Sequence, residues 1–179
     1  MIEAYLNHVP VIHPTAWVHP SAVIIGQVII GPEVSIWPGA ILRGDDGDII
    51  IGARSNIQDG TIIHATDGRS RTVIGECVTV GHRVILHGCT VGDRCLVGMG
   101  SCLLDNAVLE ADCMLGACSL LTQNKVIPSG SMALGNPAKV TRPLTDTERA
   151  WIAYSSQRYL YNAECYRTGK APTSPPPMP

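Results

Sequence analysis

The chain has 179 residues and a formal net charge of −2, and although 45% of its residues are hydrophobic, only 4% are aromatic and phenylalanine is absent. This length supports one domain with a sizeable core. A low aromatic content together with 18 glycines and 13 prolines favours short β-branched segments joined by turns over a helical bundle. The small net charge argues against nucleic-acid binding, and without a run of 18 apolar residues we expect no membrane span.

The N-terminus and the cysteines bear on the cellular compartment. Residues 1–6 lack the basic and apolar regions of a secretory signal peptide. The seven cysteines show no C-x-x-C spacing, so neither a disulfide framework nor a cysteine-ligated zinc site is expected. We therefore expect a cytoplasmic protein with reduced thiols.

A repeat of six residues begins near the N-terminus and continues through most of the chain. One aliphatic residue recurs at every sixth position, and a small residue often follows four positions later. The aliphatic positions form three runs: Ile12, Val18, Ile24, Ile30, Ile36 and Leu42; Ile51, Ile57, Ile63, Ile74, Val80 and Leu86; and Val91, Val97, Leu103, Leu109, Leu115, Leu121 and Ile127. This period predicts an all-β solenoid, a parallel β-helix whose triangular coils stack about 4.8 Å apart. Its narrow interior has room for aliphatic ladders but not for phenylalanine.

The repeat is interrupted three times, by three extra residues within 43–50, by five within 64–73 and by one missing residue within 87–90. Insertions in a solenoid form loops, often on the functional face. We therefore expect the residues of interest beside these interruptions.

The repeat fades after Ile127, and the segment 135–139 is expected to leave the solenoid. Thr145 and Glu148 have the spacing of a capping box, which predicts a helix from there to about Cys165. We expect three regions: a β-helix domain over 1–140, a C-terminal helix over 141–168 that packs on the β-helix, and a disordered tail over 169–179.

Three of the six histidines are related by the register of the repeat. His64 and His87 each follow the third aliphatic residue of consecutive coils, so they stack about 4.8 Å apart and can share one metal ion. His82 lies on a different edge, and the five extended residues from it to His87 span about 16 Å, so within one chain it cannot join the pair. Around a threefold axis a neighbour's His82 could, which predicts a three-histidine site of the catalytic type between protomers of a trimer. His13 and His19, each before a proline, are expected at corners.

The residues around these histidines resemble a known family. The motifs are Leu-Arg-Gly-Asp at 42–45, Asn-Ile-Gln-Asp-Gly at 56–60, and, within 80–89, Val-Gly-His and His-Gly-Cys separated by four residues. With them the chain is similar to the γ-class carbonic anhydrases from about residue 11 to residue 161. The resemblance implies a left-handed β-helix, although the crossover rule alone would favour a right-handed one. It also implies a homotrimer with Zn²⁺ or Fe²⁺ on His64, His82 and His87, whose metal-bound hydroxide hydrates CO₂ reversibly to bicarbonate.

The same resemblance implies roles for neighbouring residues. Arg43 and Asp59 are expected to form an ion pair that bridges protomers. Gln58 is expected to orient the metal-bound hydroxide, and Asp45 to accept a hydrogen bond from a group that surrounds the metal. Asn56 matches a further family position beside the metal.

Turnover also requires a group that exports a proton. Some members of the family carry an acidic loop for this purpose, but the loop 65–71 contains no glutamate. Asp46 lies where another family acid lies and is the better shuttle candidate here. Tyr159 aligns best with a helix tyrosine that approaches the metal in similar proteins, with Tyr154 and Tyr161 close by in the sequence.

Three other functions are compatible with the sequence. Hexapeptide acyltransferases share the fold and the exit motif at 135–139, but they use one catalytic histidine and a coenzyme A groove. An acyl-CoA thioesterase of the same family would share the histidine set, so the sequence separates it poorly. A non-catalytic assembly subunit is disfavoured because every expected ligand is present. Fold alone decides among none of these.

Overall fold

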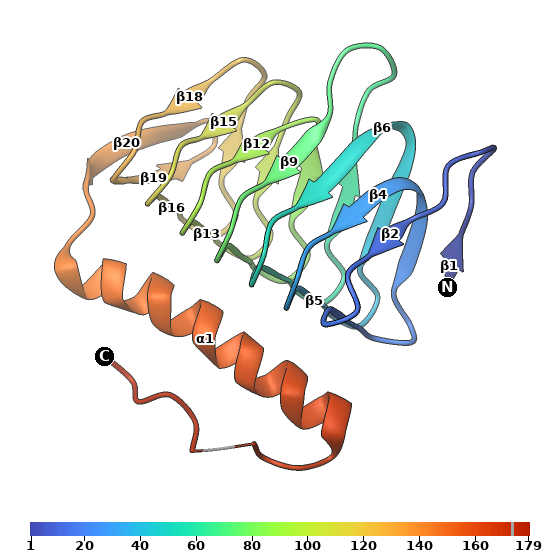
Figure 1. The fold of residues 1–179 in the computed structure, drawn as a ribbon. Helices are drawn as coiled ribbons and strands as arrows, with labels where there is room; N and C mark the ends of the chain where they lie inside the picture. The colour runs from blue at the N-terminus through green and yellow to red at the C-terminus, as the bar shows by residue number, and fades with distance from the viewer. Residues whose placement is uncertain (173) are drawn as a thin grey trace.

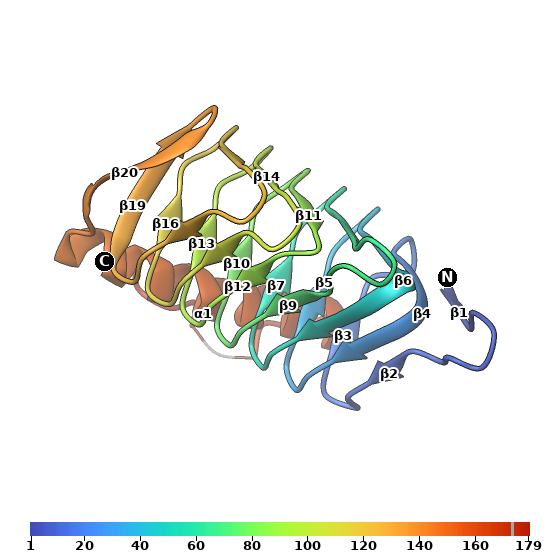
Figure 2. The ribbon, with the colours of Figure 1, turned by 90° about the horizontal axis from the view of Figure 1, so that it is seen from above.

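The computed structural model describes residues 1–172 and 174–179. The chain forms a left-handed parallel β-helix of about seven turns, with one α-helix, α1 (Asp146–Thr168), lying alongside it (Figures 1 and 2). This is the predicted fold class. Within the described residues, no helix has both the length and the apolar character needed to cross a membrane.

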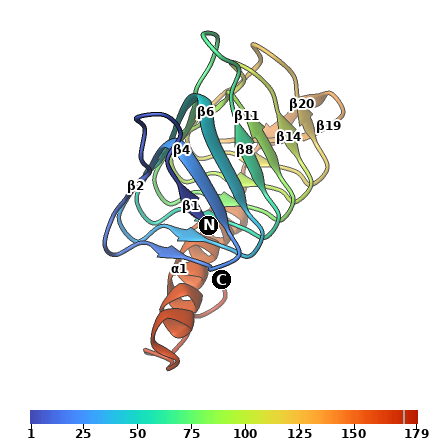
Figure 3. The same ribbon diagram turned by 90° about the vertical axis from the view of Figure 1, so that its right-hand side faces the viewer.

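The solenoid has three faces, each named here after one strand. The β8 face contains β8 (Ile62–His64), β11 (Ile85–His87), β14 (Cys102–Leu103) and β17 (Leu120–Leu121). The β9 face contains β9 (Thr72–Ile74), β12 (Thr90–Val91), β15 (Val108–Leu109) and β18 (Val126–Ile127). The β10 face contains β3 (Trp17–Val18), β5 (Ser35–Ile36), β7 (Asn56–Ile57), β10 (Thr79–Val80), β13 (Leu96–Val97), β16 (Met114–Leu115) and β19 (Ser131–Gly135). Figure 3 looks along the stacked coils from the N-terminal end.

The first insertion does not form a loop. Two long strands, β4 (Val23–Ile30) and β6 (Ile41–Ile51), run continuously from the β8 face around the corner to the β9 face. They pair with each other with a register shift at the corner, and β1 (Ile2–Glu3) and β2 (Val11–Ile12) pair with β4. The extra residues form a bulge within β6 at this corner, where residues 45–48 oppose Gln27 alone, and the bulge carries two adjacent aspartates. The second insertion does form a loop, over residues 65–71.

The aliphatic positions of the repeat fill the interior. Ile24, Ile36, Leu42, Ile57 and Leu86 are each fully buried. The core cluster of the described residues consists of isoleucine, valine, leucine, alanine and cysteine, with no aromatic residue. All seven cysteines are free thiols, and three of them are buried.

Two tryptophans and two tyrosines pack together outside the coils, under α1. The ring of Trp37 lies 5.2 Å from that of Tyr159, and the ring of Trp17 lies 5.3 Å from that of Tyr166. Both tryptophans come from the solenoid and both tyrosines from α1. The large aromatic side chains, for which the narrow core has no room, therefore attach the helix to the solenoid.

The C-terminal end differs from expectation in one respect. The segment after residue 135 does not leave the solenoid but turns back as β20 (Ala138–Pro143), antiparallel to β19. The predicted capping box is present. The Thr145 hydroxyl accepts a hydrogen bond from the Glu148 backbone amide, and the Glu148 carboxylate accepts one from the Thr145 backbone amide. Helix α1 ends at Thr168, which is the end of the expected helical region and three residues beyond the end expected from the capping box, and it runs back along the β10 face. The tail predicted to be disordered, 169–179, includes residue 173, which lies outside the described residues.

Candidate metal centre

His64 and His87 end the adjacent strands β8 and β11 and are register partners across them. This is the stacking that the repeat predicts. Nδ1 of His64 lies 3.3 Å from Nε2 of His87. Both side chains are partly buried, at 13% and 32% exposure.

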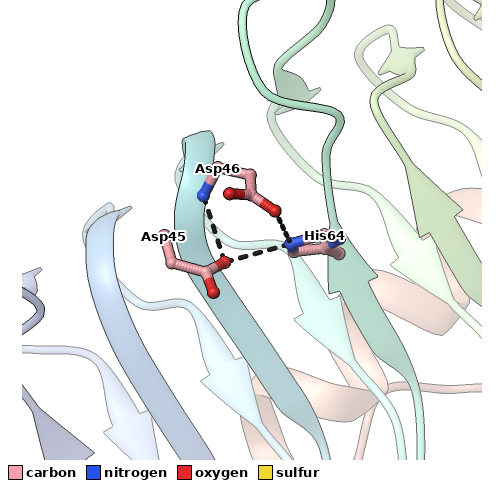
Figure 4. A group of neighbouring side chains, drawn as sticks. All are labelled: Asp45, Asp46 and His64. Atoms are coloured by element: carbon pink, nitrogen blue, oxygen red, sulfur yellow. Dashed lines mark hydrogen bonds and ion pairs between the residues drawn. The ribbon is translucent and has the colours of Figure 1, made fainter.

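The remote nitrogen of each ring faces a carboxylate. His64 Nε2 lies 3.0 Å from Asp45 Oδ1 and 3.3 Å from Asp46 Oδ2, and both aspartates come from β6 (Figure 4). His87 Nδ1 lies 3.3 Å from Asp105 Oδ1. A carboxylate accepts a hydrogen bond, so each remote nitrogen carries the proton and each facing nitrogen presents a lone pair.

Two lone pairs that face each other repel unless a cation lies between them. A tetrahedral ion bound at 2.0–2.1 Å holds two ligand nitrogens about 3.3–3.4 Å apart. The observed 3.3 Å between the facing nitrogens matches this separation. The pair therefore fits a zinc-like ion, with each ring oriented by an acid, as is usual for metal-bound histidine.

Asp45 and Asp46 differ although they are neighbours. The Asp45 carboxylate also accepts from Arg43 Nη1 at 2.5 Å. Burial acts to raise the pKa of Asp45, but hydrogen bonds from Arg43 and His64 outweigh it and lower the pKa. Asp45 is thus held as a charged acceptor, whereas the Asp46 side chain is 45% exposed and reaches solvent.

Asp105 is a site residue that the sequence reasoning missed. It accepts from Ser70 Oγ at 2.5 Å and from Thr66 Oγ1 at 3.1 Å, in addition to facing His87. Burial acts to raise the pKa of Asp105, but the bonds from Ser70 and Thr66 outweigh it and lower the pKa. One carboxylate therefore ties the loop 65–71 to the ring of a proposed ligand.

Gly88 makes this arrangement sterically possible. It has φ +63°, and a Cβ there would overlap both Ser70 Oγ and Asp105 Oδ1. The sequence held one signal for Asp105, because counting along the repeat places this residue one coil beyond Gly88. The backbone confirms that placement, since the Asn106 amide donates to the Gly88 carbonyl.

A second group of predicted residues lies where the β8 face meets the β10 face. His82 Nδ1 lies 3.0 Å from Asp59 Oδ2, so this histidine too has an acid on one nitrogen. Gln58 Nε2 donates to Asn56 Oδ1 at 3.1 Å, and Gln58 is 5% exposed. Tyr159 on α1 is half-buried beside this group, and its pKa is raised by burial and then by the charge of Asp59.

The structure thus divides the predicted site into two halves. The half at the corner between the β8 and β9 faces, here called the His64 edge, holds Arg43, Asp45, Asp46, His64 and His87. The half at the opposite edge of the β8 face, here called the His82 edge, holds Asn56, Gln58, Asp59, His82 and Tyr159.

Arg43 pairs with Asp45 inside the chain. Ligand atoms of Asp45, Asp46 and His64 also lie within 4.8 Å of one another. We attribute that cluster to hydrogen bonding, because both acids face the same protonated nitrogen.

Comparisons with known proteins agree on the family. Residues 10–44 match the family described as bacterial transferase hexapeptide (six repeats). The chain is 45% identical over 162 residues to mitochondrial γ carbonic anhydrase 2 of Arabidopsis thaliana, across 88% of this chain and 58% of that protein. It is 48% identical over 167 residues to Protein YrdA of Escherichia coli, across 89% and 90% of the two chains.

A solved structure extends the likeness to three dimensions. The hexapeptide transferase family protein from Anaplasma phagocytophilum superimposes with a TM-score of 0.88 at 43% identity, across 92% of this chain and 97% of that one. The chain spans less than two thirds of the length of the plant relative. The chain belongs to the γ-class carbonic anhydrase family of hexapeptide-repeat proteins.

Proposed function

We propose that the chain forms a homotrimer that hydrates CO₂ reversibly to bicarbonate at a shared Zn²⁺ or Fe²⁺ site. His64 and His87 of one protomer and His82 of the next are the ligands. The observation that carries this proposal is the pair of facing ring nitrogens, 3.3 Å apart, each on a ring whose other nitrogen faces an acid. His82 has the same support from Asp59, and among the described residues its other nitrogen makes no hydrogen bond.

The β8 face supports the trimer. Its outward positions form an apolar column of six register partners: Val23, Ile41, Ile62, Ile85, Cys102 and Leu120. Ile62 and Ile85 are each 42% exposed in the single chain. An exposed apolar stripe of this kind is typical of a protein interface. It lies between the two halves of the site, so packing it against the next protomer brings one half toward the other.

The same interface accounts for Arg43 and Asp59. Their side chains remain 44% and 46% exposed in the single chain, one at each edge of the β8 face. We assign them to an ion pair between protomers, whose attraction strengthens as the interface excludes water but is opposed by the cost of desolvating both charges.

The chemistry then divides among the residues. A divalent ion there would lower the pKa of its coordinated water to about 7 and supply hydroxide at neutral pH. Asp46, 3.3 Å from His64 Nε2 and exposed, passes the released proton to solvent. Gln58 uses its Nε2 to donate a hydrogen bond to Asn56, so its Oε1 is the atom that accepts a hydrogen bond from the reacting water. Tyr159 borders the same edge and limits its access to water.

Stopped-flow CO₂ hydration on Zn²⁺- and Fe²⁺-loaded protein tests the proposal. His82→Ala should abolish activity and lower the metal content, whereas His13→Ala should change neither. His13 is a matched control because, in the part of the chain that the structure describes, its ring forms hydrogen bonds only with Thr15 in its own corner. Activity of His82→Ala equal to that of the unchanged protein would refute the shared site.

A second candidate is acyl-thioester chemistry at the same centre. It is favoured by the likeness to a hexapeptide transferase family protein. Acyl-CoA hydrolysis with no CO₂ hydration in either metal form would select it, and a trimer without either activity would indicate an assembly subunit. The seven free thiols fit a reducing compartment such as the cytoplasm.

A further inference from the structure

A pocket lies between α1 and the corner where the β9 and β10 faces meet. We call it the corner pocket. Its solenoid wall is a ladder of corner residues from four successive coils, Arg54, Cys77, Arg94 and Asp112. Helix α1 closes the other side with residues that include Arg149, and the cavity measures about 150 Å³.

The corner pocket carries excess positive charge. Arg94 binds Asp112 in a two-pronged ion pair at 2.8 and 2.9 Å, so these two charges cancel. That contact is also the main reason why the pKa of Asp112 is lowered. Arg54 and Arg149 also line the pocket, and neither guanidinium has a hydrogen-bond or ion-pair partner among the described residues. Arg54 comes from the solenoid wall and Arg149 from α1, and both are exposed. The charge of Arg149 also helps to lower the pKa of Asp112, so three arginines and one aspartate leave the pocket with an excess of positive charge.

The remaining wall is apolar. Leu144 and Ile152 line the pocket and are 7% and 3% exposed. A volume of about 150 Å³ has room for a six-carbon ring. Guanidinium groups prefer carboxylate and phosphate oxygens, which they bind with paired hydrogen bonds.

We propose that the corner pocket binds a small organic oxyanion, a carboxylate or phosphate monoester with an apolar body about the size of a six-membered ring. The oxyanion lies between Arg54 of the solenoid and Arg149 of α1, and the apolar body lies against Leu144 and Ile152. Such a ligand crosslinks the helix to the solenoid. The site is at the corner opposite the β8 face, so it stays open in the proposed trimer, and the inference does not depend on the metal.

Cys77 provides a reading of occupancy at the site itself. Its half-buried thiol lines the corner pocket, whereas Cys118 is exposed at a different corner. Benzoate and phenyl phosphate, as probes, should slow alkylation of Cys77 by iodoacetamide in the full-length protein and leave Cys118 unchanged, as followed by peptide mass spectrometry. Benzamide, which has the ring without the charge, should protect about tenfold less well.

Substitution separates the pocket from non-specific anion binding. Arg149→Gln should weaken protection by benzoate about tenfold or more, and calorimetry should show the same loss. Arg71→Gln removes an exposed arginine outside the pocket and should leave binding unchanged. No protection by either anion, equal protection by benzamide, or binding that survives Arg149→Gln would each overturn the proposal.

Discussion

Two inactive variants should restore each other if the metal site is shared between protomers. His64→Ala removes a ligand at one edge of the β8 face but leaves His82 at the other edge, and His82→Ala does the reverse. In a closed threefold ring each site takes one half from each of two neighbouring protomers. A site is then intact only where a His82→Ala protomer supplies its His64 half and a His64→Ala protomer supplies His82.

The arrangement of the halves sets the size of the effect. Any mixed trimer, whether two-to-one or one-to-two, contains one intact site out of three. Random assembly from equal amounts makes about three quarters of the trimers mixed, so co-expression should recover about a quarter of the unmutated activity and of the bound zinc. Each variant alone should have neither.

The assay is CO₂ hydration by stopped flow, together with zinc content, on the co-expressed trimers. Purification through two different affinity tags keeps only the mixed trimers, for which the expected recovery rises to about a third. A matched control combines His64→Ala with His87→Ala, which damage the same half, so that no mixed trimer has an intact site. If the first combination recovers nothing, or if both combinations recover equally, the division of the site between protomers is wrong.

Three other outcomes follow from contacts in the single chain. Asp105→Asn should weaken zinc binding about 10–100-fold, because the acid that orients His87 is lost; competition with a chelator measures this, and unchanged affinity in a folded trimer would count against the role. Arg43→Ala should raise the dissociation constant of the trimer, measured by sedimentation, and a trimer that stays intact on dilution contradicts the interface role. The hydrogen bonds from Arg142 and from the Thr145 amide lower the pKa of Glu148 to about 2. A depressed carboxyl pKa stabilises above the unfolded value and loses that effect as pH falls through the folded one. Attachment of α1 should therefore weaken between about pH 4.5 and 2, and Glu148→Gln, followed by near-ultraviolet circular dichroism, should remove this acid step.

Hexad counting was sufficient to place His64 beside His87, because a coil of constant height converts sequence distance into spatial position. The same counting separated His82 from that pair. Both placements depend only on which residue follows the buried aliphatic of its coil, and the strand register bears them out.

Counting failed where the chain departs from the repeat. Asp105 acts through Ser70 and Thr66, and the shape of the loop 65–71 is not set by any period. The insertion before Ile51 was expected as a loop, but β6 carries it as a bulge. Gly44 pairs with Gly26 and Ile49 with Val28, so residues 45–48 lie opposite Gln27 alone while the ladder continues on either side. The repeat likewise did not predict the turn at Gly135. Its φ of +111° is one that residues with a side chain rarely adopt, which accounts for a glycine at this position.

The contact between α1 and the solenoid limits how this protein can change in length. A helix of 23 residues is about 35 Å long, and about seven coils stack to about 34 Å. The chain leaves the solenoid at its C-terminal end and returns as α1. The length of the helix therefore sets how far back along the solenoid Tyr159 reaches, which is to Trp37 and Asp59. One added coil at the C-terminal end would withdraw Tyr159 by about 4.8 Å. Three more helical residues would restore its height but rotate it by about 60° around the helix axis. The number of coils and the length of α1 must therefore change together. Although a solenoid could in principle gain coils one at a time, the contact with α1 fixes the number of coils here.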